Sequence, residues 1–105
     1  MKDKEIIFTE IKATARTYIA DAQVMLFGSR ARNEESPDSD YDILIVTEAS
    51  IPSERRIALR TKIRKDLLMK GYSADVLIQS RSDIDTKRRL PGHIIRNILK
   101  EAIVL

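Results

Sequence analysis

The sequence predicts an α/β (α+β) fold in which a small mixed β-sheet is flanked by helices, in the order α-β-(turn)-β-α-β-α. Three observations support it: short apolar runs of strand length, longer segments with apolar residues three and four positions apart, and a polar connection between the first two strands. Parallel strands need a long crossover, so we expect the first two strands, joined by a loop, to be antiparallel. With 105 residues, we expect residues 1–105 to form a single domain.

A helix, a strand and a loop are expected in the first part of the chain. The Asp3 carboxylate can accept hydrogen bonds from the first turn of a helix. The apolar stripe of this helix consists of Ile7, Ile11, Ala15, Tyr18 and Ile19. Residues 23–27 are apolar and end at Gly28, which indicates a buried strand. Residues 29–41 are polar and contain Pro37, so we expect a loop with one helical turn at its start.

The second part of the chain continues with two strands and two helices. Residues 43–46 form a β-branched run typical of a strand covered on both faces, and residues 74–79 form a third strand. The helix between them begins at 52–53 and ends at Gly71. Its expected inner face is Ile57, Leu59, Ile63, Leu67 and Leu68. We expect residues 80–91 to be irregular. The last helix begins near Gly92, with a stripe of Ile94, Ile95, Ile98, Leu99, Ala102 and Ile103.

Composition excludes several classes of function. The chain has 19 Lys and Arg against 16 Asp and Glu, and a net charge of +3 is too weak a field to favour direct nucleic-acid binding. It has no Cys, which excludes disulfides, cysteine-ligated zinc and thiol catalysis. No apolar run approaches the roughly 20 residues of a membrane span, and the N-terminus has no signal-peptide core. We therefore expect a cytoplasmic protein with no membrane contact.

Asp40 and Asp42 are the first candidates for a metal site. Side chains two residues apart at the entry of a strand project to the same side, about 6.6 Å apart along the chain. Two carboxylates this close repel by about 3 kcal/mol at an effective dielectric constant near 20, unless a cation lies between them. Oxygen ligands suit Mg²⁺ or Mn²⁺, which share their coordination between carboxylates and phosphates. The alternative is a pair of solvated turn residues.

Gly28 and Ser29 are candidates for binding phosphate at the end of the preceding strand. Glycine lets the backbone approach a ligand closely, and the free N–H groups of a helix start attract phosphate oxygens. The Ser29 hydroxyl adds a donor, while Arg30 and Arg32 add positive charge for a triphosphate. A third acid, Asp75, lies in an apolar strand, where it would be a metal ligand, a base for an attacking hydroxyl, or a structural acid in a salt bridge.

The pair Gly28-Ser29, followed after ten residues by Asp40-x-Asp42, resembles the pattern of the DNA polymerase β-like nucleotidyltransferase superfamily. The runs GSRAR and SPDSDYDILIV are most similar to its short branch, the minimal nucleotidyltransferases. The resemblance implies the nucleotidyltransferase fold and transfer of a nucleotide from a nucleoside triphosphate. It implies that the catalytic and metal-binding residues are Asp40, Asp42 and Asp75, with two Mg²⁺ ions, or Mn²⁺, as cofactors. It also implies that the nucleotide-binding residues are Gly28, Ser29, Arg30 and Arg32. One position departs from the pattern, because Asn33 stands where many relatives have Gly.

Small members of this branch resemble the antitoxins of two-gene toxin–antitoxin modules. That resemblance implies transfer of AMP from ATP to a tyrosine hydroxyl of an all-helical, HEPN-type RNase toxin. A single short domain fits this, because the acceptor then comes from a second chain. Two alternatives stay open: transfer to a small-molecule hydroxyl at a site completed by another chain, and a non-catalytic module that neutralises its partner by contact.

Other motifs favour structural roles. Asp83-Ile84-Asp85 is a second D-x-D without a phosphate-binding turn nearby, so we expect a loop or a cap. His93 is expected to be a surface residue at a helix start. A basic stripe with no aromatic residues for base stacking predicts a solvated helix face, or one that faces an acidic partner, rather than an RNA site; it consists of Arg56, Arg60 and Arg64. The last apolar stripe is expected in the core, with a subunit contact as the alternative.

Overall fold

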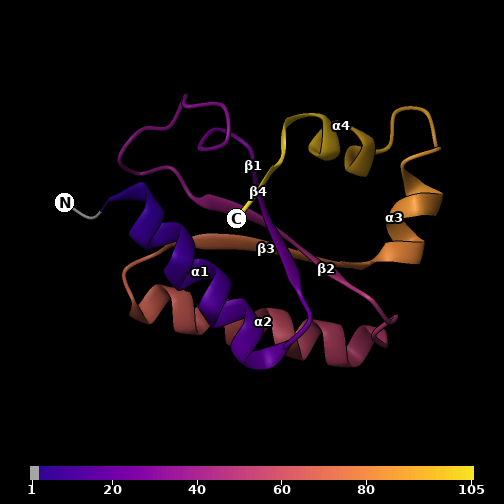
Figure 1. Cartoon of the computed structure of the whole chain (residues 1–105), viewed down its shortest axis with the longest axis horizontal. Helices are drawn as coiled ribbons and strands as arrows, with labels where there is room; N and C mark the ends of the chain where they lie inside the picture. Colours follow the sequence, from indigo (N-terminus) through magenta and orange to yellow (C-terminus); the bar gives the residue numbers. More distant parts are fainter. Residues whose placement is uncertain (1–2) are drawn as a thin grey trace.

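A computed structural model describes residues 3–105 and confirms the predicted fold class: a four-stranded mixed sheet with helices on both faces (Figure 1). The elements of these residues are α1 Lys4–Tyr18, β1 Gln23–Phe27, β2 Tyr41–Thr47, α2 Ser53–Met69, β3 Ala74–Ser80, α3 Arg81–Lys87, α4 Ile94–Glu101 and β4 Ile103–Val104. No helix among residues 3–105 has both the length and the apolar character that a membrane crossing requires.

The strands lie in the order β3-β2-β1-β4. β1 pairs with β2 antiparallel, as the loop between them predicts, while β2 and β3 are parallel because α2 provides the crossover. β4 extends the sheet by pairing antiparallel with β1. In the register, Phe27 lies beside Asp42, and Asp42 lies beside Asp75. The end of β1 and the starts of β2 and β3 therefore meet at one end of the sheet.

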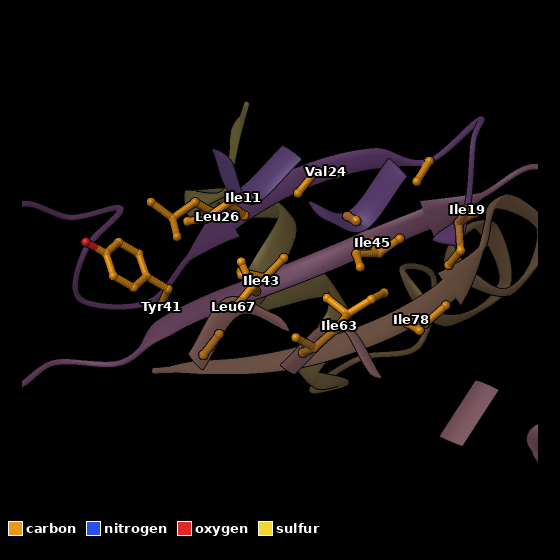
Figure 2. Close-up of a cluster of buried hydrophobic side chains, with 14 of the residues drawn as sticks. Ile11, Ile19, Val24, Leu26, Tyr41, Ile43, Ile45, Ile63, Leu67 and Ile78 are labelled. Atoms are coloured by element: carbon orange, nitrogen blue, oxygen red, sulfur yellow. The ribbon is translucent and has the colours of Figure 1, made fainter. Parts of the chain in front are cut away.

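Side chains alternate along β2 between two hydrophobic clusters. Ile43 and Ile45 belong to the larger cluster, which packs under α1 and α2. Figure 2 shows the side chains of this cluster on the strands. Leu44 and Val46 belong to the smaller cluster, under α3 and α4. The buried residues of those two helices are Ile84, Ile95 and Ile98. Both faces of β2 are thus covered, as its continuous apolar run predicts.

The first helix forms as its cap and stripe predict. The Asp3 carboxylate accepts a hydrogen bond from the Glu5 N–H at 2.9 Å, which satisfies a donor that the helix itself leaves free. Ile11 and Ala15 are buried in the larger cluster, and Ile19, the C-cap residue, joins them there.

The prediction that residues 80–91 are irregular is wrong, because α3 occupies Arg81–Lys87. The Ser80 side chain caps this helix by accepting from the Asp83 N–H at 3.1 Å. Ile84 is buried in the smaller cluster. Because this charged segment contributes one residue to the core, it has no repeat of apolar residues at helical spacing from which a helix could be predicted. Asp83 and Asp85 therefore lie on a helix and not in a loop.

Two further details of the helices differ from expectation. Ile57 and Leu68 of α2 are 54% and 64% exposed, so their expected place on the inner face is wrong. The buried residues are Leu59, Ile63 and Leu67. They repeat every four residues, whereas Ile57 lies about 200° around the helix from Leu59. The last helix ends at Glu101, and the following residues leave it to pair with the open edge of β1. Ile103 is therefore not part of a helical stripe.

Candidate active site

The candidate site lies on the α3–α4 face of the sheet, where β1 ends and β2 and β3 begin. Asp42 lies two residues before the buried Leu44, and Asp75 lies two residues before Leu77, which packs on the same cluster. Because alternate residues of a strand share a face, both carboxylates project on this side. Register pairing places their backbones directly side by side.

Gly28 forms the wall of the site opposite Asp42. Its φ is +76°, a backbone conformation that residues with a Cβ rarely adopt. A Cβ placed on Gly28 would lie 2.1 Å from Asp42 Oδ2. Any other residue would therefore adopt an unfavourable φ and would force the Asp42 carboxylate to move from its present position.

The turn that follows Gly28 is the single helical turn that the sequence predicts. The N–H groups of Ala31 and Arg32 both donate to the Gly28 carbonyl, at 3.1 and 3.2 Å. The Glu34 N–H donates to the Ser29 carbonyl at 2.9 Å. Asn33 has a φ of +56°, and asparagine is among the few residues other than glycine that tolerate this region. Asn33 thus adopts a backbone conformation that glycine, the residue of the family pattern at this position, also adopts readily.

The charges of the acids converge on Asp42. Burial, followed by the negative charges of Asp75 and Asp40, raises the pKa of the half-buried Asp42. Asp40 is exposed, and its Oδ1 accepts a hydrogen bond from the Ser73 hydroxyl at 2.7 Å. Asp75 is exposed, so the expected cost of burying its charge does not arise, and it takes part in none of the ion pairs formed within residues 3–105.

The donor set at this position suits a divalent cation with oxygen ligands. Within residues 3–105, no group of three or more Asp, Glu, His or Cys side chains is close enough together to enclose a metal ion. Asp42 and Asp75 instead form an adjacent pair whose mutual repulsion a cation would relieve. Mg²⁺ is commonly held by one or two carboxylates together with waters and substrate phosphates. The residues therefore fit a metal that is shared with a nucleotide.

The two arginines of the turn have different contacts. The Arg30 guanidinium donates twice to the Ser39 carbonyl, at 2.9 and 2.7 Å, and lies 4.0 Å from the centre of the Tyr41 ring. It therefore braces the loop between β1 and β2. Arg32 forms ion pairs with Glu34 at 3.0 Å and with Glu101 at 2.7 Å.

Glu101 and Ser73 are the site residues that the sequence analysis missed. Glu101, the last residue of α4, accepts from the Gly28 N–H at 3.0 Å as well as from Arg32. Its one sequence signal is an acid at a helix C-terminus, where the helix dipole favours cations. Ser73 gives no comparable signal, because a serine between a helix and a strand is ordinary turn chemistry.

A groove of about 570 Å³ opens beside Asp40, between the β1–β2 loop and the turn that joins α2 to β3. Tyr41, Tyr72 and Ser73 line it together with Arg30. The two tyrosine rings pack edge to face, with centroids 5.8 Å apart. An aromatic wall and an acidic rim give this groove the size and character for part of a nucleotide or an acceptor side chain.

Outside the site, the remaining candidates have structural contacts. His93 caps α4, because its Nδ1 accepts from the Ile95 N–H at 3.1 Å. On α2, Arg56 donates to the Ser53 hydroxyl, and Arg64 donates to the Ala74 carbonyl at 3.3 Å. These contacts are those of a helix cap and a solvated helix face.

Comparisons with known proteins agree with this fold. The family model of the nucleotidyltransferase domain matches residues 8–105. No protein of curated function matches the chain. Among solved structures, a toxin–antitoxin with AMP-PNP is 18% identical, with a TM-score of 0.62, covering 92% of this chain and 70% of that one. The complex of an MNT antitoxin with a tri-AMPylated HEPN toxin from Shewanella oneidensis matches at 15% identity and a TM-score of 0.58, covering 97% and 71%.

A third solved structure, of a candidate nucleotidyltransferase, is 22% identical with a TM-score of 0.64, and the match covers 92% of this chain and 95% of that one. Identities this low show a common fold, while the family model spans nearly all of the sequence. The chain therefore belongs to the nucleotidyltransferase domain family and, by fold and family, is a nucleotidyltransferase.

Proposed function

We propose that this protein transfers AMP from ATP, with Mg²⁺, to a tyrosine hydroxyl of a HEPN-type RNase toxin, and that it acts as the antitoxin of that partner in the cytoplasm. The observation that carries the proposal is the pairing of Asp42 with Asp75 directly beside the Gly28 turn. If the turn binds phosphate and the acids bind a metal, as the proposal holds, both would reach the same phosphates.

Each part of the site has a role in such a transfer. The N–H groups of Gly28 and Ser29 and the Ser29 hydroxyl would hold phosphate oxygens, with Arg32 adding positive charge. Asp42 and Asp75 would hold the metal between them, and Asp40, which is not gathered with them into one cluster in this structure, would join as the third ligand when metal and nucleotide bind. When bound, Mg²⁺ supplies charge for the phosphates and the leaving pyrophosphate, and it lowers the pKa of the incoming hydroxyl.

Asp40 would orient the acceptor. It is exposed at the rim of the groove, and the Ser73 hydroxyl fixes one of its carboxylate oxygens, so the other can face an incoming hydroxyl. The proposal places the acceptor side chain in this groove, because Asp40 lies at its rim.

The partner and the nucleotide are suggested by the solved relatives. One of them was determined with AMP-PNP, and another is a complex in which the HEPN toxin is AMPylated. A small chain with an open groove beside Asp40 suits an acceptor that another protein presents.

The test is to incubate the chain with labelled ATP, Mg²⁺ and a helical HEPN-type protein encoded beside it, and then to weigh the partner by mass spectrometry. We expect the partner to gain one or more AMP masses. Asp42→Asn should abolish the gain, because it removes a charge from the metal-binding pair. Asp85→Asn is the matched control, since it changes the second D-x-D on α3 and should leave transfer intact.

Two outcomes would contradict the proposal. A partner that is inhibited but unmodified would support neutralisation by contact alone. Transfer to small hydroxyl compounds, with the protein partner unmodified, would support the small-molecule alternative.

A further inference from the structure

Glu101 holds two donors that the proposed function assigns to phosphate. Its carboxylate accepts from the Gly28 N–H at 3.0 Å and from the Arg32 guanidinium at 2.7 Å. These contacts join residues 73 and 69 positions apart in the chain, and they tie the end of α4 to the turn after β1. The carboxylate at the end of the last helix thus contacts the turn that is proposed to bind phosphate.

The contact is ionic and accessible to solvent. The two donors lower the pKa of Glu101, with Arg32 contributing most, so this side chain is charged at neutral pH. The side chains of Glu101 and Arg32 are 29% and 44% exposed. No packing encloses the carboxylate, so it can leave the turn by a change of side-chain conformation.

A phosphate and the Glu101 carboxylate cannot share the Gly28 N–H, which has a single hydrogen to donate. Arg32 has further N–H groups, but the two anions would repel each other across its guanidinium. The negative charge of Glu101 also acts on Asp42, so the carboxylate lies within electrostatic reach of the metal-binding pair. Every anion that binds through the Gly28 N–H must therefore displace the same carboxylate, and it gains only when its own contacts outweigh those of Glu101.

We propose that Glu101 is an internal competitor for phosphate, which occupies the Gly28 N–H and part of the Arg32 guanidinium until the phosphates of a nucleotide displace it. The inference rests on the proposed function, because it concerns the same nucleotide site. It gives the end of α4 a role in raising the affinity that an anion needs to enter the turn and in reclaiming the donors once pyrophosphate has left. A ligand-free site would then remain closed to weak anions.

Glu34 provides a matched control. It also pairs with Arg32, at 3.0 Å, but its side chain is 64% exposed and its hydrogen bond within the turn is made by its backbone. Removing its charge leaves the Gly28 N–H occupied by Glu101. The two glutamates therefore differ in the one contact on which the competition depends.

The experiment compares the binding of ATP with Mg²⁺, of AMP and of inorganic tripolyphosphate to the wild type, Glu101→Gln and Glu34→Gln by titration calorimetry. If the donors are free in only about a tenth of the wild-type molecules, Glu101→Gln should bind triphosphates about tenfold more tightly. Its affinity for AMP should rise by at most the same factor, because each ligand has to displace the same carboxylate. Glu34→Gln should change affinity by less than about threefold, as expected for one exposed ion pair.

Unchanged or weaker triphosphate binding in Glu101→Gln would overturn the inference and make Glu101 a positioning residue for Arg32. Glu101→Ala, checked by thermal melting, repeats the test without any acceptor at that position. Tighter binding without AMP transfer to the partner would support the inference and contradict the proposed function. Normal AMP transfer with unchanged affinity in Glu101→Gln would support the proposed function and contradict the inference. If no variant binds triphosphate, both the proposed function and the inference are contradicted.

Discussion

The motif D-x-D recurs in the chain, and two of its occurrences, one entering β2 and one on α3, have different structural consequences. Asp40-x-Asp42 enters a strand, where residues two apart share a face, and Asp42 lies against Gly28 and beside Asp75. Asp83-x-Asp85 lies on α3, where residues two apart point about 200° away from each other. The same letters therefore give a convergent pair of charges in one place and divergent charges in the other. The strand context and the glycine turn, not the motif alone, make a candidate site.

The largest effect is expected from changing the glycine turn itself. Gly28→Ala puts a Cβ 2.1 Å from Asp42 Oδ2 and forces a residue with a side chain to a φ of +76°. We expect AMP transfer to fall by at least about a hundredfold, since small displacements of reacting groups have effects of this size. We also expect a loss of about 1–3 kcal/mol in unfolding free energy, from backbone strain and the clash.

Gly92→Ala is the control for this substitution. Gly92 has a similar φ, +77°, but a Cβ there would meet no atom within 4 Å. It should show the conformational loss of about 1 kcal/mol without the loss of transfer. Equal transfer by both variants, measured on the partner by mass spectrometry, would remove the reason for treating the first D-x-D as special.

Much of this comparison is already predictable from the sequence. The GS turn, the strand context of Asp42 and the position of Asp75 in an apolar strand are local patterns, and they predict the residues of the candidate site. Glu101 is not predictable in this way, because its place depends on where α4 ends and on β4 pairing back to β1.

The same limit explains the errors in the fold. The helix α3 depends on one buried residue, Ile84, and on a serine cap, so its charged sequence resembles a loop. Ile57 and Leu68 are apolar at helical spacing, yet the core has room for only one line of α2 side chains. Apolar periodicity identifies a helix, but the neighbouring elements decide which of its apolar residues become buried.

A second prediction contrasts the effects on stability of one aspartate from each D-x-D, Asp42 at the start of β2 and Asp83 on α3. Burial and neighbouring charges raise the folded-state pKa of Asp42, so its ionised form destabilises the fold at neutral pH. Asp42→Asn should therefore raise the Tm at pH 7 while abolishing transfer. The stabilising contribution of a raised pKa is present at low pH and lost as the pH rises through the folded pKa, so the gain should shrink on acidification.

Asp83→Asn should have the opposite sign. Asp83 lies in the first turn of α3, where the helix dipole favours a negative charge by about 0.3–1 kcal/mol. Its replacement should lower the Tm at pH 7 and leave transfer unchanged. Thermal melts of both variants in metal-free buffer between pH 3 and 8 check this, and a common sign at pH 7 would mean that the two pairs do not differ electrostatically.

The smallest effect is expected from removing a serine hydroxyl, and each of the two D-x-D regions has one to test. Ser73 donates to Asp40 at 2.7 Å, and Ser82 lies 3.1 Å from the Ser80 hydroxyl that caps α3. Ser73→Ala frees the Asp40 carboxylate to rotate, so we expect transfer to fall by roughly three- to tenfold, with a stability loss near the 0.5–1.5 kcal/mol of one hydrogen bond. Ser82→Ala should show a similar or smaller stability loss and no change in transfer. The loss in Ser73→Ala should appear in kcat more than in the KM for ATP, because Asp40 is proposed to orient the acceptor; a change confined to the KM for ATP would instead assign Asp40 to nucleotide binding.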